Sequence, residues 1–210
     1  LEYNAEVASN TQLGYILGAA YERPEIALRV ALTYESGVTH DFDTKETLPS
    51  PAFGLDDAES TTDIEMPQSL TLDFQSGVAE DTLVFGSIRW TEWSVWEVRP
   101  AGFEAATGGR VTGLDDDVMT YRLGVGRRLS DELAVFGRVT YEAGTGDDLN
   151  RLAPTDGSTS YGIGGTYTVN DMDITGGIEY AVLGGGEDSA DVTFEDNTAL
   201  GFGVSIGFKF

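Results

Sequence analysis

Four arginines and two aromatic residues are the side chains of this 210-residue sequence best suited to bind a ligand. They are Arg29, Arg89, Trp93, Arg122, Phe136 and Arg138. A guanidinium group binds a carboxylate through charged hydrogen bonds, and aromatic rings give apolar walls to the rest of a molecule. The functional hypothesis is therefore a path along which a carboxylate contacts the arginines while its apolar tail contacts the rings.

A structural ladder of ion pairs is the alternative for the same arginines. Six basic and six acidic residues occupy positions that alternate with apolar ones: Glu22, Arg29, Glu35, Asp73, Arg89, Arg122, Arg128, Arg138, Glu142, Asp173, Glu179 and Lys209. Equal numbers favour cross-strand pairs, which we prefer to a ligand path for these arginines. A dry core would not tolerate so many charges, so these positions indicate a wet interior.

Catalytic chemistry finds little support in the sequence. The single histidine, His40, lies beside Asp41 and Asp43 at the start of an acidic segment, which is typical of a surface residue. No strand places a serine predictably near it, so a serine hydrolase triad cannot be assembled. We expect no enzyme activity and no cofactor; an outer-membrane lipase or acyltransferase is a weak alternative.

Nine segments with a period of two must position these residues. The predicted strands cover residues 13–22, 26–39, 66–77, 82–96, 118–129, 133–144, 158–169, 172–183 and 198–210. Tight turns alternate with long acidic loops around residues 40–65, 97–117, 145–157 and 184–197. A soluble sandwich has no reason to place every short turn at one end, whereas outer-membrane barrels have short periplasmic turns and long extracellular loops.

Aromatic residues fall at two levels on the faces predicted to point outward. Those near the long loops are Tyr15, Tyr34, Trp90, Tyr121, Tyr141, Tyr161 and Tyr180, and those near the short turns are Tyr21, Phe74, Tyr167, Phe208 and Phe210. Aliphatic or small residues lie between the two levels, as expected for a lipid-facing band. The sequence therefore predicts an all-β fold, namely an antiparallel transmembrane β-barrel segment of about nine strands.

Composition narrows the possibilities further. The net charge of −24 and the sequence pI near 4.1 exclude nucleic acid as a partner, because phosphate binding relies on Lys and Arg. Cysteine is absent, so disulfides do not support the fold.

With the carboxyl terminus at the short-turn end, the first strand begins at the extracellular end, with residues 1–12 as the tail of a loop. An even-stranded barrel then needs an odd number of further strands before Leu1, and we treat residues 1–210 as one domain, the carboxyl-terminal part of a barrel.

Three stretches resemble the FadL/TodX family of outer-membrane transporters. They are GYILGAAYERPEIALRVALTYES at 14–36, MPQSLTLDFQSG at 66–77 followed by RWTEWS at 89–94, and TYRLGVGRRLSDELAVFGRVTYE at 120–142. The resemblance implies the last nine strands of a fourteen-stranded barrel, with the family's hatch in the part before Leu1. It also implies a hydrophobic loop groove, to which the 40–65 segment would contribute Phe42, Phe53 and Leu55.

The function implied by this resemblance is transport across the bacterial outer membrane. Long-chain fatty acids or aromatic hydrocarbons would pass by passive diffusion through the barrel. The alternative is a general porin or structural barrel with a polar lumen. Expected partners are a hydrophobic small molecule, outer-membrane lipid and lipopolysaccharide, with the protein a monomer. The acidic loops lack EF-hand spacing, so we expect solvation or divalent bridging to lipopolysaccharide rather than a dedicated metal site; adaptation to salt is equally compatible.

Overall fold

The computed structural model describes residues 3–47, 57–146, 149, 152, 154–188 and 191–209. The chain forms two compact units. The first, which we call the loop unit, comprises Leu1–Leu17, Tyr34–Ser69 and Thr91–Asp117. The second, the sheet unit, comprises Gly18–Thr33, Leu70–Trp90 and Val118–Phe210.

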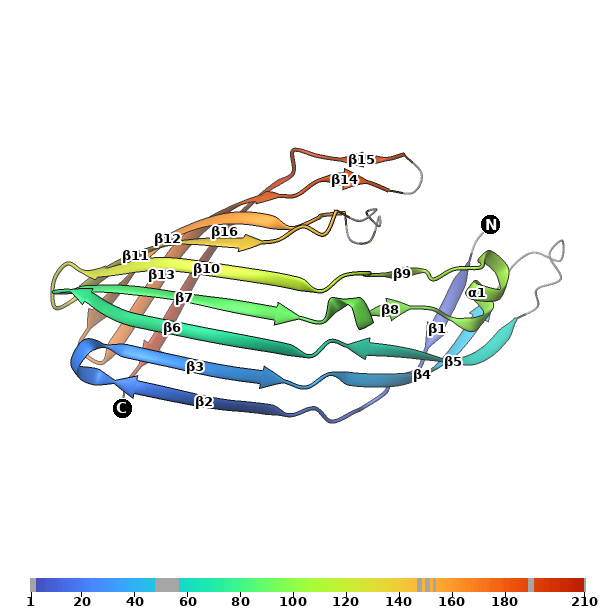
Figure 1. Ribbon diagram of the computed structural model, residues 1–210, viewed down its shortest axis with the longest axis horizontal. Coiled ribbons are helices and arrows are strands. Elements are labelled where there is room, and N and C mark those ends of the chain that lie inside the picture. The colour runs from blue at the N-terminus through green and yellow to red at the C-terminus, as the bar shows by residue number, and fades with distance from the viewer. Residues whose placement is uncertain are drawn as a thin grey trace. The chain divides into compact units, whose positions relative to one another are not determined.

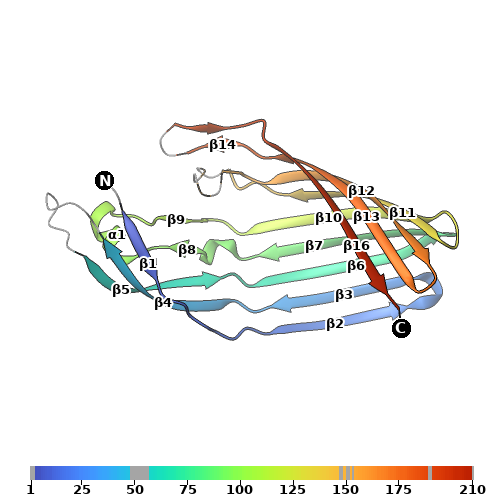
Figure 2. The same ribbon diagram turned by 180° about the vertical axis from the view of Figure 1, so that it is seen from behind.

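A nine-stranded antiparallel sheet runs through the sheet unit (Figures 1 and 2). Its strands lie in the order β16-β13-β12-β11-β10-β7-β6-β3-β2. Each strand of this sheet therefore lies beside the sheet strands that come before and after it in the sequence. The bounds are β2 Ile16–Arg23, β3 Leu28–Glu35, β6 Ser69–Ala79, β7 Thr82–Thr91, β10 Val118–Arg128, β11 Leu133–Glu142, β12 Ser158–Val169, β13 Met172–Leu183 and β16 Thr198–Phe208. The prediction of nine antiparallel strands is confirmed, with ends that differ by a few residues.

The short turns at one end of the sheet are also confirmed. The 3₁₀-helix η1, Pro24–Ile26, joins β2 to β3, and Ala27 after it has a left-handed φ of 48°. Asn170 closes the β12–β13 hairpin with a φ of 51°, a conformation that Asn tolerates better than most residues. At the other end, β14 (Gly186–Glu187) and β15 (Thr193–Phe194) form a small hairpin within the connection from β13 to β16.

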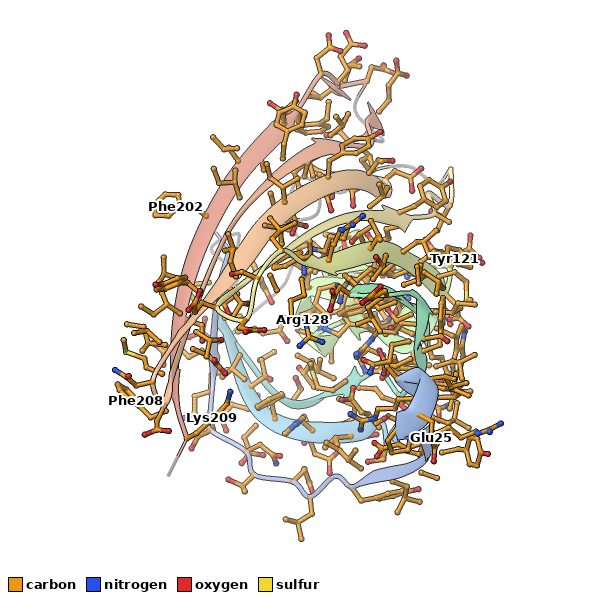
Figure 3. All side chains as sticks on the ribbon, turned by 90° about the vertical axis from the view of Figure 1, so that its left-hand side faces the viewer. Glu25, Tyr121, Arg128, Phe202, Phe208 and Lys209 are labelled. Carbon is orange, nitrogen blue, oxygen red and sulfur yellow. The ribbon has the colours of Figure 1, made fainter. Side chains whose placement is uncertain are left out.

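The pairing register fixes which side chains share a face of the sheet. Tyr121 pairs with Tyr141, Ile163 with Ile178, and Ile178 with Phe202, all in one set of alternating positions. Figure 3 shows Phe202 on the outer side of the curved sheet and Arg128 on its inner side. Because successive side chains point to opposite faces, the residues in register with Phe202 lie on the outer side, and those that alternate with them, Arg122 and Arg138 among them, lie on the inner side.

Burial in this fold is the reverse of that in a soluble protein. Leu149, at 8% exposure, is the only fully buried large apolar side chain among the described residues. Phe202, by contrast, is 89% exposed and Val204 73% exposed. So large an apolar outer face has no stable place in water, but it suits contact with hydrocarbon.

The loop unit contains regular structure that the sequence did not predict. Strands β4 (Val38–Thr47) and β5 (Ala58–Met66) pair as a hairpin, and β1 (Asn4–Val7) pairs with β4. The segment from 40 to 65, expected from the sequence only as a long loop, therefore contains strands in its described residues, and residues 1–12 include a strand. The unit also contains the 3₁₀-helix η3 (Trp93–Val95), the pair β8 (Glu97–Val98) and β9 (Thr112–Gly113), and helix α1 (Ala101–Thr107). Within the described part of the chain, no helix is long and apolar enough to span a membrane.

Arginine substitutions in β16 test the assignment of its faces. Val204→Arg or Ile206→Arg places a charge on the outer face, and we expect a loss of about 2–4 kcal/mol in folding into a bilayer if the position lies near the midplane. Ser205→Arg, between them on the inner face, is the matched control and should cost much less. Equilibrium unfolding of the full-length protein in lipid vesicles measures the three values, and equal losses at 204, 205 and 206 would contradict the assignment.

Candidate functional site

Three of the predicted arginines lie together on the inner face of the sheet. Arg29 on β3, Arg122 on β10 and Arg138 on β11 line one hollow of about 500 Å³. Leu83 and Phe85 of β7 form apolar parts of its wall. The hollow therefore combines guanidinium groups with apolar surface.

Arg138 and Phe136 extend this lining in two directions. Both line a second hollow of about 490 Å³ over β12, β13 and β16, and a third of about 630 Å³ toward the short turns. Arg138 is the one residue that lines all three hollows. Its position makes it the centre of the charged inner surface.

An ion pair that spans two strands holds Arg138 in place. Arg138 Nη2 contacts Glu179 Oε2, and Ser160 Oγ donates a hydrogen bond to Glu179 Oε1 at 2.8 Å. Gly162 pairs with both Arg138 and Glu179 and therefore lies between them on β12. A Cβ atom on Gly162 would lie 3.0 Å from Arg138 Nε, so the guanidinium group crosses β12 only because this position has no side chain.

Phe136 lies over the neighbouring glycines in the same way. A Cβ atom at Gly164 on β12 would be 2.5 Å from Cζ of Phe136, and one at Gly177 on β13 would be 3.9 Å from it. On β7, the ring of Phe85 likewise lies against Gly124 of β10. The inner surface thus presents two flat aromatic rings that rest on glycines of adjacent strands.

Ion pairing distinguishes the arginines from one another. Arg29 Nε lies 3.2 Å from Glu22 Oε1, and Arg138 pairs with Glu179. Arg122 Nε donates to Thr140 Oγ1 at 3.4 Å, and Arg122 makes no ion pair with any residue the structure describes. Arg122 is therefore the one of these three arginines without an ion pair among the described residues.

The predicted ladder of ion pairs is confirmed at several points. Besides the pairs of Arg29 and Arg138, Lys209 Nζ lies 2.9 Å from Asp173 Oδ2 and Arg128 Nε lies 3.1 Å from Asp81 Oδ1. The pairs of Arg29, Lys209 and Arg128 join neighbouring strands or their turns, whereas the pair of Arg138 spans β12. They are exposed to solvent in the sheet unit, so each stabilises the fold only modestly.

None of the other predicted site residues that the structure describes is among the residues that line this hollow. Arg89, on β7, is absent from the lining of the three hollows. Trp93 belongs to the loop unit, where its ring packs edge-on against Trp96 at 6.4 Å between centroids. Phe42 is also in the loop unit, and Phe53 and Leu55 lie outside the described residues.

Phe85 is the lining residue that the sequence prediction missed. It lies on the same face of β7 as Arg89, four residues earlier, and it lines two of the hollows. Its position on the same alternating face as Arg89 was the sequence signal that could have identified Phe85 as a lining residue. The glycines opposite the rings carry no such signal, because their importance depends on which strands are neighbours.

The proposed loop groove has one described member, Phe42. Its ring stacks on His40 at 5.5 Å with an angle of 15° between the planes. His40 Nδ1 lies 3.0 Å from Asn10 Oδ1. These contacts give both side chains a structural role on β4 and provide no nucleophile beside the histidine.

A buried carboxylate organises the loop unit. Glu46, only 1% exposed, accepts hydrogen bonds from the backbone N–H groups of Gly102 and Phe103, both at 2.7 Å, and from the hydroxyl of Tyr3 at 2.8 Å. The two amides belong to the first turn of α1, where N–H groups have no partner within the helix. Burial and the neighbouring Glu46 raise the pKa of Tyr3, so its phenol remains a hydrogen-bond donor.

Alanine substitutions at Gly164 and Gly126, on the two strands beside Phe136, test whether the position of its ring depends on a neighbouring glycine. Gly164→Ala should displace the ring and cost about 1–3 kcal/mol of stability. Gly126→Ala is the matched control, because Gly126 flanks Phe136 on β10 and an added Cβ would meet its nearest atom at 3.7 Å. Denaturant unfolding of the full-length protein measures both, and equal stabilities would contradict the ring's placement.

Replacing Glu46 tests the link between β4 and α1. In Glu46→Gln, one carboxylate oxygen becomes an NH₂ group facing a backbone N–H donor, so the opening free energy of α1 should fall by about 2 kcal/mol. Glu59→Gln is the control, because Glu59 forms an exposed pair with Lys45. Hydrogen exchange at Gly102 and Phe103 reports the result, and unchanged protection in Glu46→Gln would show that the carboxylate does not hold the helix.

Comparisons with known proteins agree with this geometry. The fold resembles that of a FadL homologue from Pseudomonas aeruginosa, at 13% identity and a TM-score of 0.63, over 92% of this chain and 49% of that one. It also resembles the toluene transporter TodX of Pseudomonas putida, at 16% identity and a TM-score of 0.51, over 80% of this chain and 43% of that one. The chain thus spans about half the length of these proteins.

Sequence comparison supplies the family. A search of curated proteins finds no match. The sequence model of one family, described as outer membrane protein transport protein (OMPP1/FadL/TodX), matches residues 4–204. This range is nearly the whole chain. The chain therefore belongs to the FadL/TodX family of outer-membrane transport proteins.

Proposed function

We propose that this chain forms the nine-stranded part of a barrel wall, one domain of a protein that carries hydrophobic molecules across the outer membrane by passive diffusion. The substrates we infer are long-chain fatty acids or aromatic hydrocarbons. The family and the apolar outer face support the location, and the inner surface supports the choice of substrate. The proposed passage involves no chemical step and no cofactor.

The observation that carries the choice of substrate is the environment of Arg122. It lines a hollow with Leu83 and Phe85, and neither Asp73, which lines the same hollow, nor any other carboxylate that the structure describes forms an ion pair with it. An amphipathic carboxylate fits such a hollow, because its head can pair with the guanidinium group while its chain covers the apolar wall. We therefore favour fatty acids over uncharged hydrocarbons.

A general porin or structural barrel is the second candidate. The pairs Arg29–Glu22, Arg138–Glu179 and Lys209–Asp173 favour it, since a lumen lined by balanced charges holds water. Such a lumen would pass small polar solutes without preference for apolar ones. The two functions therefore differ in the relative rates for a fatty acid and a sugar.

Uptake into liposomes containing the full-length protein tests the proposal. Oleate should enter faster than a small sugar; faster sugar flux would favour the porin.

Arg122→Gln should slow oleate uptake about tenfold, the effect of losing roughly 1.4 kcal/mol from a charged hydrogen bond. Arg122→Lys should retain much of the rate, and toluene uptake should be unchanged in both variants because toluene has no charge. Equal oleate rates in wild type and Arg122→Gln would remove Arg122 from the path.

A further inference from the structure

The outer face of the nine strands carries an unusual set of charges. The sequence contains 36 acidic and 12 basic residues, so acids outnumber bases threefold. In the described strands, however, the outward positions hold no Asp or Glu, and their only charged side chains are Arg23 on β2 and Arg127 on β10. Although the protein is strongly acidic, the only charged residues at the outward positions of the described strands are therefore basic.

The orientation of the two arginines follows from their neighbours. Arg127 lies between Arg128, which points inward in Figure 3, and Gly126 of the inner face, so its own side chain points outward. Arg23 follows Glu22, whose side chain pairs with Arg29 on the inner face, and its extended backbone (φ −133°, ψ 93°) continues the alternation up to Pro24. Both arginines are exposed.

Both arginines lie near the short-turn ends of their strands. Arg23 is the last residue of β2, and Arg127 is the second-last residue of β10. Tyr21 and Leu129, 61% and 57% exposed, lie on the same outer face beside them. The end of a strand is also the level at which a barrel leaves the hydrocarbon and meets headgroups.

The inner and outer bases at this end differ in their partners. Arg128 pairs with Asp81 and Lys209 with Asp173 on the inner face. Neither Arg23 nor Arg127 makes an ion pair or a side-chain hydrogen bond with any residue that the structure describes. An unpaired guanidinium group on a lipid face is costly near the midplane but costs little at the headgroup level, where its apolar stem can lie along the sheet and its head can reach phosphate.

We propose that Arg127 and Arg23 each bind the phosphate group of an anionic phospholipid in the periplasmic leaflet. Short turns lie on the periplasmic side of outer-membrane barrels, so these arginines face the phospholipid leaflet rather than lipopolysaccharide. The outward strand positions hold no Asp or Glu to repel a headgroup, and, Glu22 of the inner face aside, the acids nearest in sequence to the two arginines, Glu25 and Asp131, belong to the short turns. In the sheet order β3, β6 and β7 separate β2 from β10, so the two arginines form separate lipid sites. This proposal rests on the outer-membrane location and not on the transported substrate.

Native mass spectrometry of the full-length protein with phosphatidylglycerol tests the Arg127 site. Arg127→Gln should weaken retention of the lipid about fivefold, the change expected for loss of one basic residue at a lipid surface. Arg128→Gln is the matched control, since it removes the same charge from the adjacent inward position, and it should change retention less than twofold. Arg127→Lys should retain most of the binding and remains informative if the glutamine variant folds poorly. Arg23→Gln should act independently, so that the double variant loses both contributions.

Two further lipids identify what the arginines recognise. Diacylglycerol has the acyl chains without the phosphate, so its retention should be the same in wild type and Arg127→Gln. Lipid A, from the opposite leaflet, should not replace phosphatidylglycerol at this site. The proposal is overturned if Arg127→Gln retains phosphatidylglycerol as wild type does, if Arg128→Gln loses as much, if diacylglycerol shows the same loss, or if lipid A competes equally.

Discussion

The alternation of apolar and polar side chains along nine strands is the constraint on which the rest of this structure depends. A strand directs successive side chains to opposite faces, and the sheet satisfies its backbone hydrogen bonds between neighbours. Phe202 and Val204 can be almost fully exposed only because their face meets hydrocarbon. The same alternation leaves the arginines and their acidic partners on the other face, opposite the apolar one.

Glycine on the inner face determines how far side chains can reach across the sheet. Strands two apart are separated by about 10 Å, so a side chain on the middle strand would normally block contact between them. Gly162 removes that obstacle and lets Arg138 reach Glu179. Gly164 does the same for the ring of Phe136, so the glycines shape both the ion pairs and the apolar parts of the hollows.

The sequence was sufficient to predict the nine strands and their faces, because a period of two is a local signal. It placed Arg29, Arg122 and Arg138 on one face, but it could not show that Arg122 forms no ion pair with any residue the structure describes. That distinction depends on how side chains meet in space: Glu22 reaches Arg29 across a turn, whereas Arg138 reaches Glu179 across β12, 41 residues along the chain.

The loop unit was harder to predict for a physical reason. Strand β4 reads V-T-H-D-F-D-T-K-E-T and is polar on both faces, so it lacks the hydrophobic alternation that identifies a strand. Helix α1 has seven residues, too few to show a helical period. Glu46 joins the two through hydrogen bonds to Gly102 and Phe103, 56 and 57 residues away, a contact that no local pattern reveals.

The central claim is that one face of the sheet contacts lipid and the other faces a wet lumen. These 210 residues contain no cysteine, so single cysteines can be placed along Thr198–Phe208 of the full-length protein, with any cysteine outside these residues replaced by serine, and spin-labelled in a bilayer. Accessibility to oxygen, which concentrates in hydrocarbon, should peak at 200, 202, 204 and 206, and accessibility to a water-soluble nickel complex should peak at the positions between them. Accessibility without a two-residue period, or with the opposite phase, would contradict the account.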